Sequence, residues 1–305
     1  MAIVRDRPAA HQARPGGSNR LGGALPYLLP ALLIFALFEY YPLLRVLYLS
    51  FTDADLLKSP KWVGLANYAR MLQNPEFLNS LVVTLVFALA VTGLEVILGM
   101  ALGFLMNRPG PFQGLVRGAV FAPVVVSLAA AGVIWLHLLN PTGGPLNGLL
   151  QFLGLPPSRW LQDPHTALIS LILISLWKGV GLSAVLYLAG LQGIPKELHE
   201  AAQVDGATSF QAARLVTIPL LAPITLLVFF ISLVGTFQNY GLILVLRTDG
   251  GPVGSTMLLG YYIYQNAFQY FQMGYASAVS VFLFLLLAFL SWVQFKISEG
   301  RVHYQ

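Results

Sequence analysis

The residues of this sequence with the clearest chemical pattern lie in a polar segment between two long apolar runs. The segment reads Glu200-Ala201-Ala202-Gln203-Val204-Asp205-Gly206 and extends to Pro219. It combines acidic and small residues with an Asp-Gly pair typical of turns, and its proline opens the next apolar run. Such a segment is too structured for a simple connector, and we interpret it as a surface on which another protein docks.

Local rules predict two short helices within this segment. Pro195 suits the first position of a helix, where its missing N–H is not needed. Gly206 takes positive φ readily and ends the first helix, and Thr208 or Ser209 caps the second. Pro219 then begins the next apolar run. From spacing alone, an ordinary amphipathic loop at the membrane surface fits equally well, and this alternative stays open.

Composition places the rest of the chain in a lipid bilayer. Of its 305 residues, 57% are hydrophobic and only 10% are charged, whereas soluble proteins carry about 25% charged residues. The absence of cysteine excludes disulfides, thiolate metal sites and cysteine nucleophiles. The net charge of +5 does not indicate nucleic-acid binding, because the basic residues are dispersed at the ends of the apolar runs.

Six apolar runs are each long enough to cross about 30 Å of hydrocarbon as a helix. None alternates polar and apolar residues, so a closed barrel is not expected. The sequence therefore predicts an all-α membrane protein with six transmembrane helices. The runs are Tyr27–Phe51, Leu78–Met106, Leu115–Leu139, Thr166–Ala189, Leu220–Leu246 and Ala276–Phe295.

The distribution of Lys and Arg predicts the orientation, because these residues gather on the cytoplasmic side. With the N-terminus inside, the cytoplasmic side holds Arg5, Arg7, Arg14, Arg20, Arg108, Arg117, Lys196, Arg214, Lys296 and Arg301. The outer side then holds only Lys58, Lys61, Arg70, Arg159 and Arg247. Both termini and the polar segment are thus predicted to be cytoplasmic. We expect a disordered tail at 1–25, a membrane domain at 26–298 and a short tail at 299–305.

Ionisable residues inside the runs are costly and are therefore candidates for function. For Lys178 we favour a structural polar contact, and for Glu95 both interpretations stay open. Gly93, Gly99 and Gly103 are expected to allow close helix packing. The outer segment 247–275 is rich in aromatic residues and is expected to form an interfacial belt, or alternatively a lip of a translocation path.

The polar segment also matches a longer pattern. Glu-Ala-Ala is followed after three residues by Gly, and after nine more by an aliphatic residue, any residue, an aliphatic residue and Pro. This arrangement resembles the EAA signature of ABC-importer permeases, although Val and Ile stand where Ile and Leu are usual. The stretch from Ile194 to Ala207, and Gly250-Gly251-Pro252 with Ser255-Thr256, resemble the carbohydrate branch. The matched residues are Glu200-Ala201-Ala202, Gly206, Val216, Ile218 and Pro219.

The resemblance implies the type I importer fold and a specific role for the polar segment. Residues 195–218 would be coupling helices that dock into a cleft on a cytoplasmic ATPase, and Asp205 and Pro219 belong to the predicted set. Glu200 would bond to the ATPase, Ala201 and Ala202 would pack in its cleft, and Gly206 would make the turn. Closure of the ATPase dimer on ATP would rock the helices between inward-open and outward-open states.

The resemblance also implies partners and a location. The complex would contain a second related permease, two ATPase subunits and an external solute-binding protein, in the inner membrane of a bacterial or archaeal cell. We expect this chain to be non-catalytic and to hold no cofactor or metal. It lacks a Gly-x4-Gly-Lys-Ser/Thr loop, so the energy for transport must come from another polypeptide or from an ion gradient. ATP and Mg²⁺ would be bound by the partner ATPases. Lipid would surround the chain, and no nucleic acid is expected.

A carbohydrate path needs hydrogen-bonding groups and flat aromatic faces. Gln238, Asn239 and Tyr240 offer two amides and a ring side by side, and Trp135 and Trp177 add surfaces for stacking. We predict that these residues line the substrate path, although polar residues also serve as contacts between membrane helices.

Three alternatives remain. A permease for glycerol phosphate or amino acids differs only in solute class. An ion-coupled secondary transporter would need paired acids or an ion site at a discontinuous helix, and the lone Glu95 and lack of a clear inverted repeat argue against it. For an intramembrane enzyme, Gly181-Leu182-Ser183 is only a faint serine-protease match, with Ala184 in place of the expected glycine. Metal hydrolysis is unsupported, because no His-Glu-x-x-His motif occurs.

Overall fold

The computed structural model describes residues 20–55, 59–246 and 249–299, with side chains from 27 to 296 in these ranges. Most of the expected tails lie outside the described residues, as do Lys58, Arg247 and Arg301. The chain divides into two compact units, Met1–Tyr48 and Leu49–Gln305, and each is described by itself. Most of the described chain is helical, and the isolated β-bridge within it joins Thr52 to Trp62.

The first unit forms a long helix, interrupted by one π turn, that matches the first predicted span. It consists of α1 (Arg20–Phe35), the π turn η1 (Ala36–Tyr40) and α2 (Tyr41–Leu49). The stretch Tyr27–Leu49 is long and apolar enough to cross a membrane, and none of its most apolar part is buried against the rest of the protein. The wide turn precedes Pro42, whose ring would otherwise meet the carbonyl four residues earlier. The helix starts at Arg20, inside the range expected to be a disordered tail.

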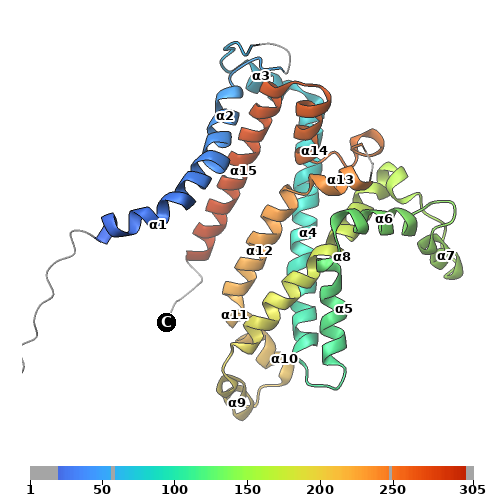
Figure 1. The fold of residues 1–305 in the computed structure, drawn as a ribbon. Coiled ribbons are helices and arrows are strands. Elements are labelled where there is room, and N and C mark those ends of the chain that lie inside the picture. The colour runs from blue at the N-terminus through green and yellow to red at the C-terminus, as the bar shows by residue number, and fades with distance from the viewer. Residues whose placement is uncertain (1–19, 56–58, 247–248, 300–305) are drawn as a thin grey trace, which may run out of the picture. The chain divides into compact units, whose positions relative to one another are not determined.

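Three straight helices span the second unit: α4 (Pro75–Asn107), α8 (Pro164–Gln192) and α15 (Met273–Glu299). Asn74 and Asp163 cap α4 and α8 by accepting hydrogen bonds from the backbone N–H groups of Glu76 and His165 at 2.8 Å. Each of these two helices has proline in its first turn. Three of the predicted spans are therefore confirmed as long helices (Figure 1).

Two glycines of α4 allow its backbone to approach α8 closely. A Cβ at Gly99 would lie 2.7 Å from Cβ of Ser183, and one at Gly103 would lie 2.7 Å from Cβ of Tyr187. These two glycines therefore allow the close packing predicted from the sequence, as small residues commonly do between membrane helices. Gly93 does not share this role, because a Cβ there would meet nothing within 4 Å.

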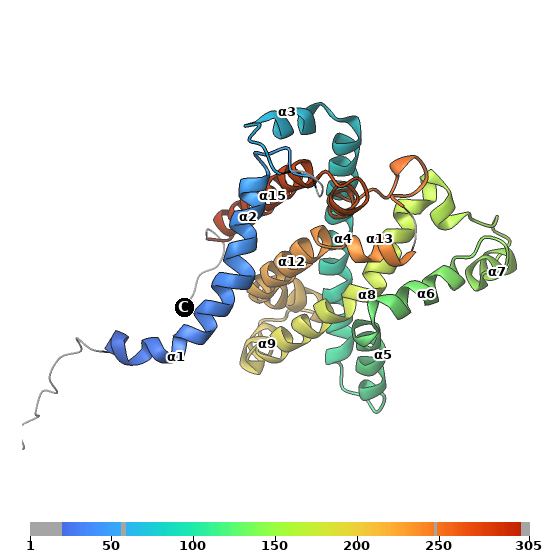
Figure 2. The same cartoon turned by 45° about the horizontal axis from the view of Figure 1, so that its top comes forward.

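The third predicted span is broken, which corrects the expectation of one continuous helix over Leu115–Leu139. Helices α5 (Gln113–Val125) and α6 (Leu128–Leu138) meet at an angle of 102°. Pro123 weakens the end of α5, and Ser127 caps α6 by accepting a hydrogen bond from the N–H of Ala130 at 3.2 Å. In both views α6 and α7 (Pro145–Phe152) extend to one side of α4, and α12 lies on the other (Figures 1 and 2).

The fifth predicted span also differs from one helix over Leu220–Leu246. Helix α12 runs only from Ala222 to Phe237, and α13 (Tyr240–Leu246) follows after a short turn. Before α12, the helical stretch Ser209–Leu220 is bent from it by 63°. Including both bent pairs, the described residues hold up to six membrane spans by length and composition.

The aromatic segment after α13 is only partly an exposed belt. Tyr261 and Tyr262, in α14 (Leu259–Tyr264), are 1% exposed and belong to the core. Burial raises the pKa of the Tyr262 phenol, and a 2.9 Å hydrogen bond with the Tyr275 hydroxyl adds to the effect. The residues after α14 are the exposed ones: Phe268 before the end of η5 (Gln265–Gln269), then Tyr270 and Phe271. The expected belt is therefore wrong for Tyr261 and Tyr262. Tyr262 is covered by α3 (Ala66–Gln73) and α15, and Tyr261 packs in a core cluster formed with α4, α8 and α13.

Candidate functional site

The polar segment between α8 and α12, residues 195–220, is called the coupling segment below. It begins with α9 (Lys196–Val204), and Pro195 is the N-cap, one residue before the predicted first position. The turn after α9 has Gly206 at φ +81°, and the N–H of Ala207 donates to the carbonyl of Ala202 at 2.9 Å. This geometry closes a helix C-terminus and favours glycine.

The second helix of the coupling segment starts at a reciprocal cap. Thr208 accepts a hydrogen bond from the N–H of Gln211 at 3.3 Å, and the Gln211 side chain accepts one from the N–H of Thr208 at 2.8 Å. This capping box fixes the start of α10 (Ser209–Ala212). Of the two predicted caps, Thr208 is therefore confirmed.

Pro219 does not begin the fifth span, which corrects its predicted position. It lies in α11 (Ile218–Leu220), after the π turn η3 (Ala213–Thr217), and Pro223 is the proline in the first turn of α12. The N–H of Ile218 donates to the carbonyl of Ala213, one residue further back than in an α-helix. The wide turn makes room for the Pro219 ring. A π turn, η1, also precedes Pro42 in the first unit.

The outer surface of the coupling segment is exposed. Glu200, Ala201, Asp205 and Gly206 are exposed, and Ala202 is half-buried. Beside them stand three large apolar side chains that the sequence analysis did not select. Val204 is 87% exposed, Phe210 is 74% exposed and Leu215 is 70% exposed. Val204 ends α9, Phe210 lies in α10 and Leu215 lies in η3, and large exposed apolar groups on one polar segment are typical of a protein interaction site.

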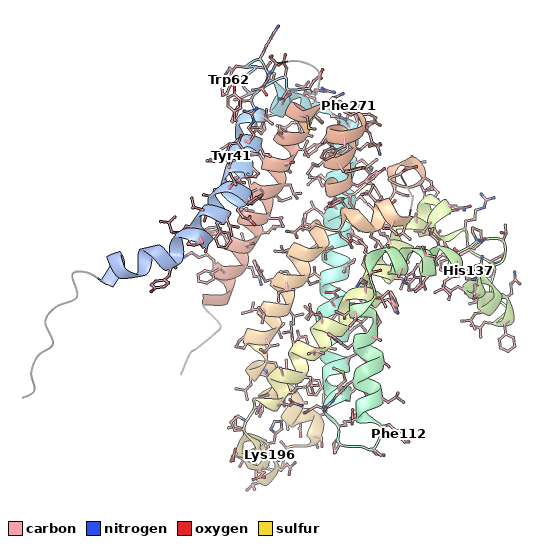
Figure 3. The ribbon with its side chains drawn as sticks, in the orientation of Figure 1. Tyr41, Trp62, Phe112, His137, Lys196 and Phe271 are labelled. Carbon is pink, nitrogen blue, oxygen red and sulfur yellow. The ribbon has the colours of Figure 1, made fainter. Side chains whose placement is uncertain are left out.

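His199 joins the two halves of the coupling segment. Its Nε2 lies 3.1 Å from the Thr217 hydroxyl, so α9 is linked to the π turn η3. Next to this bond is a groove of about 870 Å³, which reaches from Gln203 and Phe210 to Phe104 in the last turns of α4 and Arg108 just after it. Figure 3 places Lys196 and Phe112 at one end of this unit and Phe271 at the other.

A second site lies among the spans and is called the intramembrane cavity. Its volume is about 230 Å³, and α4, α6, α8, α12 and the start of the turn to α13 supply its walls. Most of the lining is apolar, but amide, hydroxyl and charged groups converge on it. The polar side chains are Glu95, Ser175, Lys178, Ser183, Ser232, Thr236 and Asn239.

Lys178 secures the broken span beside this cavity. Its ammonium group donates to the carbonyls of Pro123 at 3.2 Å and Val124 at 3.1 Å. These carbonyls belong to the last turn of α5, where backbone acceptors lack helical partners and a cation is favoured. The structural contact favoured for Lys178 is confirmed.

Glu95 is the buried acid of the cavity, with 7% of its surface exposed. Hydroxyl groups of Ser183 and Ser232 lie against its carboxyl group. Gly179 leaves space for this group, because a Cβ there would overlap Oε1 of Glu95. The carboxyl group thus occupies a place shaped by α8 and α12.

Among the predicted path residues, only Asn239 lines the cavity. Its amide donates to the Ser175 hydroxyl at 3.3 Å. Gln238 is exposed and Tyr240 stacks on Tyr264 with 6.3 Å between ring centroids, so both lie outside the lining. Trp135 and Trp177 meet edge to face at 5.6 Å, also outside it. In the part of the chain that is described, no three His, Asp or Glu side chains are grouped for a metal ion.

Residues 95–303 match the family described as binding-protein-dependent transport system inner membrane component. The chain belongs to this family. This permease is 34% identical to the sn-glycerol-3-phosphate transport system permease protein UgpA of Agrobacterium fabrum, over 92% of this chain and 96% of that one. It is 33% identical to the arabinooligosaccharides transport system permease protein AraP of Bacillus subtilis, over 90% and 88%.

The fold of the permease is also known from solved structures. A crystal structure of a bacterial alginate ABC transporter contains a chain with a TM-score of 0.80 at 22% identity, covering 90% of this permease and 93% of that chain. The predicted ABC-importer architecture is therefore confirmed, and the permease is a multi-pass membrane protein. Its family works with a solute-binding protein and an ATPase. The family match includes the coupling segment and all of the cavity lining except Val91.

Proposed function

We infer that this permease forms half of an ATP-driven translocation path for a sugar or sugar-like solute. The observation that carries this proposal is the intramembrane cavity, whose serines, Thr236 and Asn239 offer hydrogen-bonding groups inside an otherwise apolar bundle. Small-molecule sites have this character, with a few polar groups placed in an apolar lining. At about 230 Å³ the cavity is smaller than typical sites of roughly 300–1,000 Å³, which fits one wall of a chamber completed by a second permease.

The coupling segment supplies the mechanical input in this proposal. Glu200, Ala201, Ala202, Asp205 and Gly206 form the surface that docks on an ATPase. The segment passes through η3 and α11 directly into α12, which carries Ser232 and Thr236 of the cavity. A displacement of the docked surface therefore moves a wall of the cavity, and this links ATP-driven closure to solute access.

The complex proposed here contains two related permeases, two ATPases that bind ATP and Mg²⁺, and an external solute-binding protein. This chain has no catalytic role in it. In this proposal both termini and the coupling segment face the cytoplasm, the side on which Lys and Arg gather. The position of Arg108 beside the coupling segment supports this side for the segment.

A glycerol phosphate permease is the second candidate, because the Agrobacterium relative carries that name. The cavity favours a neutral sugar. Phosphate sites are built from cationic side chains or helix N-termini, and the cavity's single lysine already donates to two carbonyls. The name of the Bacillus relative supports a carbohydrate.

Uptake by the assembled complex in proteoliposomes, with its binding protein and internal ATP, tests the proposal. Labelled lactose, maltose, trehalose, arabinobiose and sn-glycerol 3-phosphate serve as probes. We expect uptake of at least one neutral sugar, dependent on ATP and lost on Glu200→Ala with Gly206→Val. Uptake of glycerol phosphate alone would favour the second candidate, and uptake that persists without ATP would contradict coupling to an ATPase.

A further inference from the structure

Glu95 combines burial, a position in the cavity and spare hydrogen-bonding capacity. A carboxyl group within a membrane span is costly and marks a functional site by default. Glu95 is 7% exposed, lies well inside α4 and reaches the cavity between α8 and α12. Gly179 is the residue whose missing side chain makes this position available.

The hydroxyl groups around Glu95 do not use up its acceptors. An ionised carboxyl group offers about four acceptor sites, a protonated one keeps acceptor capacity beside its O–H donor, and a serine hydroxyl has one hydrogen to donate. Ser183 and Ser232 lie against the group. The Ser232 hydroxyl also donates to Thr92 Oγ1 at 3.3 Å, so its hydrogen is shared with another acceptor. At most two of the acceptor sites are filled by these serines.

The ammonium group of Lys178, the nearby cation, is mostly engaged elsewhere. Lys178 lines the same cavity, but two of its three N–H donors go to the carbonyls of Pro123 and Val124. Across the cavity, Ser175 and Asn239 bond to one another at 3.3 Å. Glu95 is therefore the strongest free acceptor facing the space that a solute would enter.

We propose that Glu95 is a specificity-determining residue, whose carboxyl group accepts hydrogen bonds from hydroxyl groups of the solute in the cavity. The solute class that fits is a neutral, hydroxyl-rich molecule, because adjacent hydroxyls supply the donors that the acid lacks. A site built to bond a hydroxyl rejects analogues without it. The proposal rests on the proposed transport of carbohydrate.

Deoxy analogues of the sugar test the proposal in the reconstituted complex. The probes are the neutral sugars named above and their monodeoxy analogues, supplied with saturated binding protein. For wild type, removal of the contacted hydroxyl should lower the uptake rate about tenfold, the worth of one hydrogen bond. In Glu95→Ala the same removal should change the rate less than twofold, and Glu95→Gln should keep part of the discrimination.

Ser80→Ala is the matched control, because Ser80 is a buried polar residue of α4 bonded only within its own helix. This variant should show the same loss of uptake rate for each deoxy sugar as wild type. Co-purification of the ATPase confirms that each variant assembles into the complex. If Glu95→Ala does not assemble, the deoxy penalties of Glu95→Gln are compared with those of wild type. Equal deoxy penalties in wild type and the Glu95 variants would overturn the proposal while leaving carbohydrate transport intact. If wild type moves none of the sugars, carbohydrate transport itself fails, and this proposal fails with it.

Discussion

The coupling segment and the intramembrane cavity are built in opposite ways. The coupling segment is one continuous stretch, held by local devices such as the Gly206 turn and the Thr208 cap, and it exposes apolar side chains. The cavity takes side chains from five helices between Val91 and Leu242, and its polar side chains lie in an otherwise apolar lining. Docking surfaces can thus be encoded by a short motif, whereas a solute cavity depends on how distant helices pack.

The largest effect should come from the turn of the coupling segment. Gly206→Val places a β-branched residue at φ +81°, a conformation that costs roughly 1–2 kcal/mol or more without glycine. We expect ATP-driven uptake to fall at least about 100-fold, because the docked helix ends in the wrong place. Uptake by proteoliposomes measures this fall, and co-purification of the ATPase measures whether the two proteins still associate.

Gly206→Asn is the control for that variant, since asparagine tolerates positive φ better than valine. Space is not the issue, as a Cβ at Gly206 meets nothing within 4 Å. Asn should therefore retain much more transport than Val. Equal loss in both variants would show that the backbone conformation of this turn is not what matters.

Helix packing beside the cavity should give the next largest effect. Gly99→Ala inserts a methyl group 2.7 Å from Cβ of Ser183, and we expect a loss of about 1–3 kcal/mol in the free energy of unfolding. Gly93→Ala on the same helix meets nothing and should be neutral or slightly stabilising. Thermal unfolding in detergent compares the two. Matching melting temperatures would mean that α4 and α8 are not closely packed at Gly99.

Lys178→Met tests the support of the broken span. The variant keeps the length of the side chain but leaves the carbonyls of Pro123 and Val124 without their donor, at a cost of about 1–3 kcal/mol. Melting temperature and uptake should both fall, and Lys178→Arg should recover part of each. A stable, fully active Met variant would exclude a role for this contact.

The smallest effect is expected at the link within the coupling segment. His199→Ala removes the 3.1 Å bond to Thr217, which is worth about 1 kcal/mol. Uptake should drop only a few-fold, because Gly206 and the capping box still shape the segment. Thr217→Ser keeps the hydroxyl and should behave as wild type. A loss as large as that of Gly206→Val would make this contact, and not the turn, the main determinant.

The sequence predicted local features well because neighbouring residues determine them. The turn at Gly206, the cap at Thr208 and the long helices α4, α8 and α15 follow from propensity, capping and apolar length. The break after Val125 was missed, although Pro123 followed by a capping Ser127 is a readable signal for it. Pro219 was misplaced because Pro223, four residues later, serves the first turn of α12.

Features set by packing were not predictable from spacing. Asn239 reaches the cavity while its neighbours Gln238 and Tyr240 do not, since α12 ends at Phe237 and the chain turns there. The contact of Lys178 with α5 joins residues more than fifty positions apart. The sequence did not predict that Val204 and Phe210 belong to the docking surface, because apolar residues mark such a surface only once their exposure is known.

The most direct test uses the absence of native cysteine in the chain. Ala201→Cys, on the exposed face of α9, and Phe271→Cys, at the opposite end of the second unit, each create a single thiol. In the assembled complex, the thiol at 201 should cross-link to the ATPase and be inaccessible to an impermeant reagent outside the cell, whereas that at 271 should be labelled from outside and yield no such cross-link. Labelling at 201 from outside, or an ATPase cross-link from 271 instead, would contradict the account.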